Sequence, residues 1–252
     1  MLRHLRFEFL ALSFCALVGF AFTQNVKAAT ILEMSLGDAT TDIEYNAGTL
    51  HTVNDGNLAT NGEQDTGVLF LNFVDSYGPD ILSAPLGSLT LAGLVPTPAG
   101  PNSALLINQA TVIQNFAGGT LSLWDQNNNL LLSGNLGSSA LTGAVGNPTG
   151  GLFQTSFGTV TGGALMGYVD PNSFLMSMNF TSIQTIPGGQ TGLTLAAPPP
   201  PGMVVNVQLN PFRADATIDV EANQGVIPEP TTAGMLLTLA AVASLLRRRT
   251  AR

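Results

Sequence analysis

Positive charge is nearly absent from the body of this sequence. Eight residues are lysine or arginine, and seven of them lie near the two ends: Arg3, Arg6, Lys27, Arg247, Arg248, Arg249 and Arg252. Between Ala29 and Gly225 there is one basic residue, Arg213, and there are fourteen of the sixteen acidic residues, so the formal charge of this span is 1 − 14 = −13. Such a surface repels phosphate backbones and anionic lipid, which excludes nucleic acid as a partner.

Tryptophan and tyrosine are also scarce, with one and three residues respectively. Two carboxylates suffice for glycoside hydrolysis, but clefts that cleave sugars usually present aromatic platforms as well. The glutamates that would have to pair are scattered along the chain: Glu33, Glu44, Glu63 and Glu221. We therefore expect a protein that is not an enzyme, with a glycan hydrolase or lyase as the weaker alternative.

The first 28 residues have the pattern of a secretory signal peptide. A positively charged start precedes a continuous apolar run, Phe9–Phe22. Val26 and Ala28 place small residues at the −3 and −1 positions of a cut after Ala28. The run is shorter than the ~20 residues that a membrane-spanning helix needs. We expect residues 1–28 to form a signal helix that is removed on export, with a buried N-terminal helix as the alternative.

Cysteine and histidine are almost missing, with one and two residues. The cysteine, Cys15, lies within the predicted signal, so the exported chain has no thiol. This excludes disulfides, thiolate metal sites and a cysteine nucleophile. The remaining histidine, His51, cannot make a common zinc site, which needs three or four nitrogen or sulfur ligands. No G-x-S-x-G element surrounds a serine, so we expect His51 to be an ordinary strand or turn residue.

Glycine and proline are abundant, with 28 and 15 residues, and they separate short runs of Thr, Val, Ile, Leu and Phe. This punctuation is typical of strands and turns. The expected strands include Thr30–Leu36, Thr49–Val53, Val68–Val74, Ser88–Leu91, Ala104–Phe116, Phe174–Phe180, Val204–Leu209 and Ala214–Val220. About ten to twelve strands at roughly 8- to 15-residue spacing predict an all-β fold, a single antiparallel β-sandwich of jelly-roll type.

Several segments also predict which faces are buried. Two of them place alternate residues on one face: Phe174, Met176, Met178 and Phe180, and Ala214, Ala216, Ile218 and Val220. Val68–Val74 is nearly all apolar, which predicts a strand covered on both faces. Ala104–Phe116 is expected to bend or break near Gln109, and Pro198–Pro201 to connect two strands, because proline lacks the ladder donor.

The stretch Gly119–Leu136 predicts a β-hairpin, because Leu121 and Leu123 alternate with polar positions and Asp125–Asn129 supplies turn residues. Trp124, beside Asp125, is the candidate for a ligand contact. Two loops are rich in the oxygen donors that calcium prefers, with the candidate ligands Asp55, Asn57, Asp65 and Asp125. Neither loop matches the EF-hand pattern, so we expect plain turn chemistry in both loops, with a calcium site as the weaker alternative.

The C-terminal stretch Val226–Arg252 has three parts in fixed order. Pro228, Glu229 and Pro230 form an extended strip, because proline fixes its own φ and restricts the residue before it. Ala233–Leu246 is an uncharged run of 14 residues (246 − 233 + 1); as a helix it spans ~21 Å, less than a ~30 Å hydrocarbon core. Arg247, Arg248 and Arg249 then favour a cytoplasmic end. This predicts a short transmembrane helix that serves as a transient anchor.

The ordered combination of Val226–Pro230, the apolar run and the terminal arginines resembles the PEP-CTERM sorting segment of bacterial exported proteins. The resemblance covers about a tenth of the 252 residues. It implies a Gram-negative host that makes exopolysaccharide. It also implies recognition, and cleavage near Pro228–Pro230, by an exosortase, which is an integral membrane enzyme.

These observations predict a signal peptide (1–28), a β-sandwich cargo (29–225) and a sorting segment (226–252). We expect an exported, non-enzymatic surface or extracellular matrix protein associated with exopolysaccharide or biofilm. Its expected partners are the secretion machinery, an exosortase, the inner membrane during transit, and exopolysaccharide. The alternative function is a carbohydrate- or calcium-binding β-sandwich module.

Overall fold

Fourteen strands account for most of the chain that the structure describes. The computed structural model describes residues 29–36, 41–53, 65–73, 86–167, 170–199 and 201–223. The strands are β1 (Ala29–Ser35), β2 (Ile43–Asn46), β3 (Thr49–Thr52), β4 (Asp65–Phe73), β5 (Leu86–Ala92), β6 (Val95–Pro96), β7 (Ala104–Ile107), β8 (Thr111–Ala117), β9 (Thr120–Asp125), β10 (Leu130–Ala144), β11 (Gly151–Gly162), β12 (Leu175–Thr185), β13 (Val204–Val207) and β14 (Phe212–Ala222). Within these ranges the helical structure is one 3-10 turn, η2 (Ala164–Gly167).

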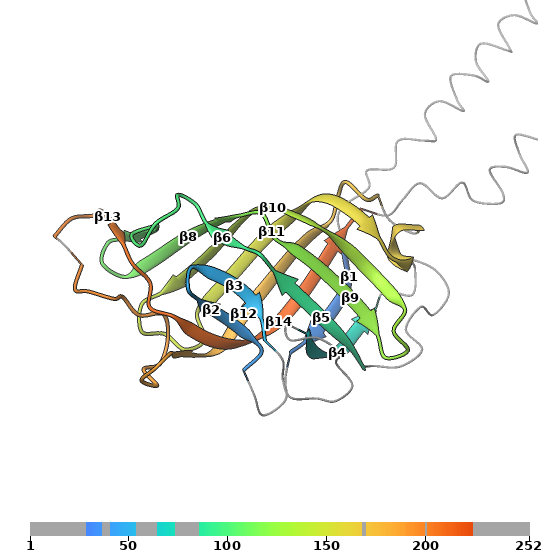
Figure 1. Ribbon diagram of the computed structural model, residues 1–252, viewed down its shortest axis with the longest axis horizontal. Coiled ribbons are helices and arrows are strands. Elements are labelled where there is room, and N and C mark those ends of the chain that lie inside the picture. The colour runs from blue at the N-terminus through green and yellow to red at the C-terminus, as the bar shows by residue number, and fades with distance from the viewer. Residues whose placement is uncertain are drawn as a thin grey trace, which may run out of the picture.

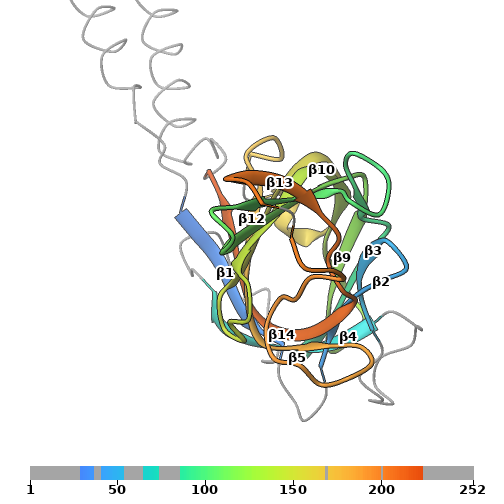
Figure 2. The same ribbon diagram turned by 90° about the vertical axis from the view of Figure 1, so that its left-hand side faces the viewer.

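Eight of the strands close into an antiparallel barrel. Their order is β11-β12-β14-β1-β4-β5-β9-β10, and β10 pairs with β11 to complete the circuit. Figure 2, seen from one end, shows the strands arranged around a common axis. The predicted all-β class is correct but the β-sandwich is wrong. Sandwiches and barrels share the same alternation of inward and outward side chains, so the pattern that predicted the strands could not distinguish them.

The six remaining strands lengthen the barrel, because two long strands change partners along their length. β10 pairs with β9 through Leu130–Asn135 and with β8 through Ser139–Ala144. β14 pairs with β1 near its C-terminal end and with β2 through Phe212–Ala214. A bridge between Leu50 and Leu94 joins β3 to the segment before β6. A second circuit, β14-β2-β3-β6-β8-β10-β11-β12, therefore follows the first along the axis, and the body is elongated (Figure 1).

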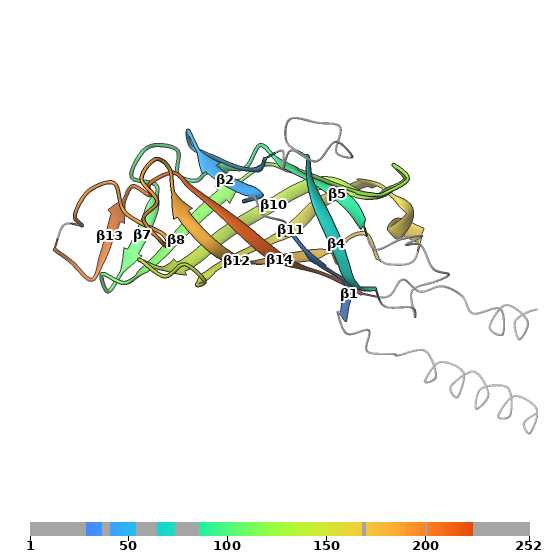
Figure 3. The same cartoon turned by 90° about the horizontal axis from the view of Figure 1, so that it is seen from below.

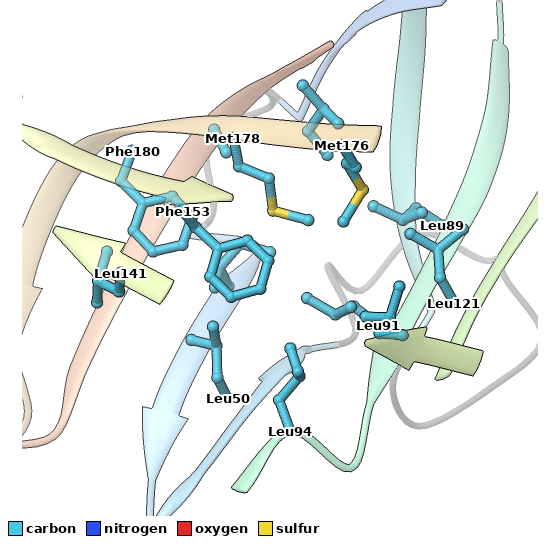
Figure 4. Close-up of a cluster of buried hydrophobic side chains, with 14 of the residues drawn as sticks. Leu50, Leu89, Leu91, Leu94, Leu121, Leu141, Phe153, Met176, Met178 and Phe180 are labelled. Atoms are coloured by element: carbon cyan, nitrogen blue, oxygen red, sulfur yellow. The ribbon is translucent and has the colours of Figure 1, made fainter. Parts of the chain in front are cut away.

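Side chains fill the interior of both circuits. Figure 4 shows Leu50, Leu94, Phe153 and Met178 pointing toward a common centre, and each is fully buried. In the second circuit, five aromatic rings from five strands form a closed ring of contacts, with neighbouring centroids 5.5–6.4 Å apart: Tyr45, Phe116, Phe153, Phe180 and Phe212. These separations are in the favourable range for aromatic pairs. The barrel is thus a packed core and not a pore.

The predicted faces are confirmed for two strands and wrong for a third. In β12 and β14 the alternate apolar residues named above are buried, and the break near Gln109 occurs between β7 and β8. The predicted hairpin is confirmed by the pairing of β9 with β10. In β4, however, Leu69 and Leu71 are 41% and 51% exposed, so this strand is not covered on both faces. It forms part of a barrel wall, of which only the inner face is packed by the core.

The first and last strands bring the two ends of the described body together. β1 and β14 are neighbours, and Ala29 and Ala222 are register partners. Viewed from below, β14 runs from the region of β2 to that of β1 (Figure 3). Within the described ranges, no helix has the length and apolar character needed to cross a membrane. The predicted signal helix (1–28) and the predicted transmembrane helix (Ala233–Leu246) lie outside these ranges.

Candidate functional site

A pocket of about 620 Å³ lies where three loops meet beside the second circuit. Its lining residues come from the turn between β2 and β3, the segment from β6 toward β7, and the segment between β13 and β14: Tyr45, Asn46, Ala47, Gly48, Val95, Pro96, Ala99, Gly100, Pro101, Gln208, Leu209 and Pro211. Tyr45, Pro96 and Leu209 are buried, whereas the turn residues Ala47 and Gly48 are exposed. The buried members therefore form the base of this mouth pocket and the exposed members its rim.

Two buried polar side chains that bond to each other lie beside the tyrosine at the base of the pocket. Ser103 Oγ donates to Gln114 Oε1 at 2.9 Å, and Gln114 Nε2 donates to the Asn115 carbonyl at 2.8 Å. The Ser103 side chain also lies beside the Tyr45 side chain. Burial raises the pKa of Tyr45, and the neighbouring Ser103 side chain offsets only part of that rise. The hydroxyl is therefore neutral at ordinary pH, and its ring is held in place by Phe116 and Phe212.

The body's only arginine and only histidine meet one carboxylate on the outer wall. Arg213 and His51 are the register partners of Glu44 on either side of β2, and Arg213 Nε lies 2.7 Å from Glu44 Oε2. Burial alone would raise the pKa of Glu44, but hydrogen bonds from Asn46 and Arg213 and the positive charge beside it lower the pKa overall. Glu44 thus stays ionised as an ion-pair partner, which does not suit it to proton transfer.

His51 lies in β3, as an ordinary strand position. Its Nδ1 is 3.4 Å from Thr49 Oγ1. This distance is near the upper limit for a hydrogen bond, so any such bond is weak. The Thr49 hydroxyl also lies 3.0 Å from the Asn46 carbonyl, to which it donates. A hydroxyl whose proton is directed at a carbonyl is not activated by the imidazole, so this group of residues lacks the geometry of a nucleophile and its base.

The candidate ligand residue Trp124 and the calcium candidate Asp125 lie at the end of β9. Trp124 is half-buried on the outer side of the strand. The Asp125 carboxylate is buried and accepts from the backbone N–H groups of Asn127 and Asn129 and from Asn129 Nδ2, all at 2.8 Å. Burial raises the pKa of Asp125, and these hydrogen bonds lower it by more. The carboxylate therefore closes its own turn, which is the arrangement that turn chemistry predicts.

The other predicted site residues are not brought together with Asp125. Asp65 starts β4 and accepts a hydrogen bond from the Thr90 hydroxyl. Asp55 and Asn57 lie outside the described residues, as do the sorting residues Pro228, Glu229 and Pro230 and the arginines Arg247, Arg248 and Arg249. Among the residues that are described, no group of three or more His, Cys, Asp or Glu is placed to hold a metal ion. A calcium site in the 54–65 loop stays a prediction.

A row of register partners crosses the outer wall of the first circuit. Successive register partners on β10, β11, β12, β14 and β1 are Ala140, Gln154, Ser177, Asp219 and Glu33. The last two are carboxylates directly opposite each other on neighbouring strands, an arrangement that destabilises a sheet. This row is uncharged on β10, β11 and β12 and acidic on β14 and β1.

Comparison with protein-family models, curated proteins and solved structures finds no match to this chain. A function for this chain must therefore be argued from its own residues. Sequence reasoning missed the mouth pocket, because its lining comes from three loops that are far apart along the chain. The closely spaced prolines of Val95–Pro101 were the one local signal, since they mark a rigid segment that must lie outside the central strands.

Proposed function

We propose that this chain is an exported, non-enzymatic surface or extracellular matrix protein, whose C-terminal segment is recognised and cut by an exosortase. The observation that carries the proposal is the pairing of Ala29 with Ala222. It supports a cargo in which the two segments that carry the predicted processing sites leave the barrel at the same end. Signal and sorting segments that both enter the inner membrane would then require no rearrangement of the body.

Both predicted cuts would leave the barrel intact. Cleavage after Ala28 leaves β1 complete, because that strand begins at Ala29. Pro228 lies six positions (228 − 222) beyond the end of β14 at Ala222. Six residues of extended chain span at most about 20 Å. An exosortase could therefore reach the Pro-Glu-Pro strip while β14 remains paired on both sides.

The packing of the body suits a durable carrier rather than a catalyst. Its interior is filled by aromatic and aliphatic side chains. The Glu44 carboxylate accepts hydrogen bonds from Asn46 and from Arg213 of the neighbouring strand β14, and that of Asp125 accepts them from its own turn. These are arrangements that hold a fold in place. With the sorting segment, they support a structural protein associated with exopolysaccharide or biofilm.

The test is the intact mass of the protein released by cells that express three variants. Glu229→Ala, and separately deletion of residues 247–252, is expected to leave uncleaved precursor in the membrane. Glu221→Ala is the matched control, because it removes an outward-facing acid at the end of β14 without touching the sorting strip. Release of correctly cut protein from both sorting variants would refute the proposal, as would a mature mass that still includes residues 231–252.

A further inference from the structure

The mouth pocket has the composition of a site for an uncharged ligand. All twelve described residues that line it are uncharged, and its volume of about 620 Å³ lies within the roughly 300–1,000 Å³ of small-molecule pockets. We propose that this pocket binds a short, uncharged oligosaccharide. The proposal goes beyond the sorting function and does not depend on it.

The base and sides of the pocket present rigid apolar surface. Tyr45 contributes an aromatic ring that is fixed by its neighbours Phe116 and Phe212, with centroid distances of 6.1 and 5.5 Å. Three prolines contribute flat surfaces without backbone donors: Pro96, Pro101 and Pro211. The C–H faces of a pyranose ring are apolar, so they fit against such surfaces, and little side-chain entropy is lost on binding.

The rim supplies polar groups suited to sugar hydroxyls. Gln208 is exposed at the rim, and its amide both donates and accepts, as hydroxyl groups do. Gly48 and Gly100 have φ values of +78° and +126°, and a Cβ at either would meet nothing within 4 Å. The space beside both Cα atoms is therefore open to a ligand. Hydroxyl-rich ligands gain from several such donors and acceptors arranged around one apolar surface.

Charge argues for a neutral sugar over an acidic one. A carboxylate or sulfate in the pocket would lose hydration without gaining a cation. The body's one arginine, Arg213, is 2.7 Å from Glu44. Glu44 lies on the opposite face of β2 from Tyr45, since neighbouring residues of a strand point to opposite faces. Arg213 is therefore already paired with Glu44, and it lies on the opposite face of the wall from the Tyr45 side chain.

The pocket lies far from the point where the chain leaves the barrel. Pro211 lines the pocket and immediately precedes β14, whose 11 residues end at Ala222 beside Ala29. A strand of that length extends roughly 35 Å. A ligand could thus enter from the end opposite Ala29 and Ala222. If the sorting function holds, this end faces away from the membrane and toward the polysaccharide outside.

The experiment measures binding of the released protein to maltotriose, cellotriose and mannotriose by ligand-observed NMR and calorimetry. Trigalacturonate is the charged comparison, and a decaproline peptide tests whether an extended peptide is the true occupant. Ala99→Trp places an indole in the pocket, and Ala197→Trp is the matched control on an exposed loop residue outside the lining.

We expect at least one neutral trisaccharide to bind, about tenfold or more weaker binding to Ala99→Trp, and unchanged binding to Ala197→Trp. Three results would overturn the proposal: no neutral trisaccharide binds at millimolar concentration, both variants bind equally, or trigalacturonate or decaproline binds more tightly. The mass of the released protein is measured on the same sample. Failure of sugar binding is thereby distinguished from failure of the sorting function.

Discussion

Replacing Asp125 by alanine should destabilise the barrel through the β9–β10 turn. In the folded protein the carboxylate accepts three hydrogen bonds at 2.8 Å, two from backbone N–H groups and one from Asn129 Nδ2. Hydrogen bonds to a charged acceptor contribute about 1.5–3 kcal/mol each when both partners are buried. The donors Asn127 and Asn129 are exposed and regain water once freed. We therefore expect the free energy of unfolding to fall by about 2 kcal/mol in total.

The same contacts predict how this loss changes with pH. Because the net effect on the pKa of Asp125 in the folded protein is a decrease from its ordinary value of 3.8, the ionised form favours folding. That contribution is fully present above about pH 4 and is lost as the pH falls through the lower pKa of the folded state. The difference in stability between the parent protein and Asp125→Ala should therefore be largest near neutral pH and shrink below pH 3.

Urea unfolding followed by tryptophan fluorescence measures both effects. Trp124 is the only tryptophan of the chain and is adjacent to Asp125, so its emission reports on the turn directly. Asp170→Ala is the control, because that carboxylate receives its side-chain contacts on one oxygen and from a single exposed residue, Asn172. The control should lose less than about 1 kcal/mol. Equal losses at the two positions, or an Asp125 effect that is undiminished at pH 2.5, would refute the role assigned to these hydrogen bonds.

Two further stability measurements test the core and the outer wall. Phe153 and Phe180 stack with an interplanar angle of 3° and a centroid distance of 6.4 Å, so a double-mutant cycle of their leucine variants should give a coupling energy of about 0.5–1.5 kcal/mol; additive losses would contradict a specific ring contact. Asp219→Asn should raise stability at low salt by a few tenths of a kcal/mol up to ~1, because Asp219 faces Glu33 across the strands. Glu221→Gln, whose register partners Thr30 and Leu175 are uncharged, should give no gain.

Local pattern predicted individual strands well, and the reason is visible in β12 and β14. Each has a strict period of two, and each buries the predicted face. The closure of the strands into a barrel was not predictable in the same way, because it depends on pairings between segments that are distant in the sequence. β10 is one continuous run in the sequence, yet it leaves β9 and joins β8 halfway along. A change of partner leaves the alternation of faces untouched, so nothing in the local pattern distinguishes it from a sandwich strand.

The two candidate sites differ in how far the sequence can indicate them, for a related reason. The predicted sorting strip Pro228–Pro230 is contiguous, so that prediction rests on neighbouring residues alone, and the strip lies outside the residues that the structure describes. The mouth pocket is assembled from loops at 45–48, 95–101 and 208–211, and only the second circuit of strands brings them together. Trp124, which composition singled out, lies on the outer side of β9, whereas the aromatic residue in the pocket is Tyr45.

The closed topology also explains how one body could serve two roles without conflict. β14 contacts both ends of the barrel, since Phe212 pairs with Tyr45 beside the pocket and Ala222 pairs with Ala29 at the chain exit. Because the same strand is paired along both edges, neither end can open without disrupting the packed interior between them. Cutting the chain beyond Ala222 should therefore leave the pocket unchanged. Equal affinity of the precursor and the released form for a neutral trisaccharide is the consequence, and a difference between them would mean that the two ends are coupled through the barrel.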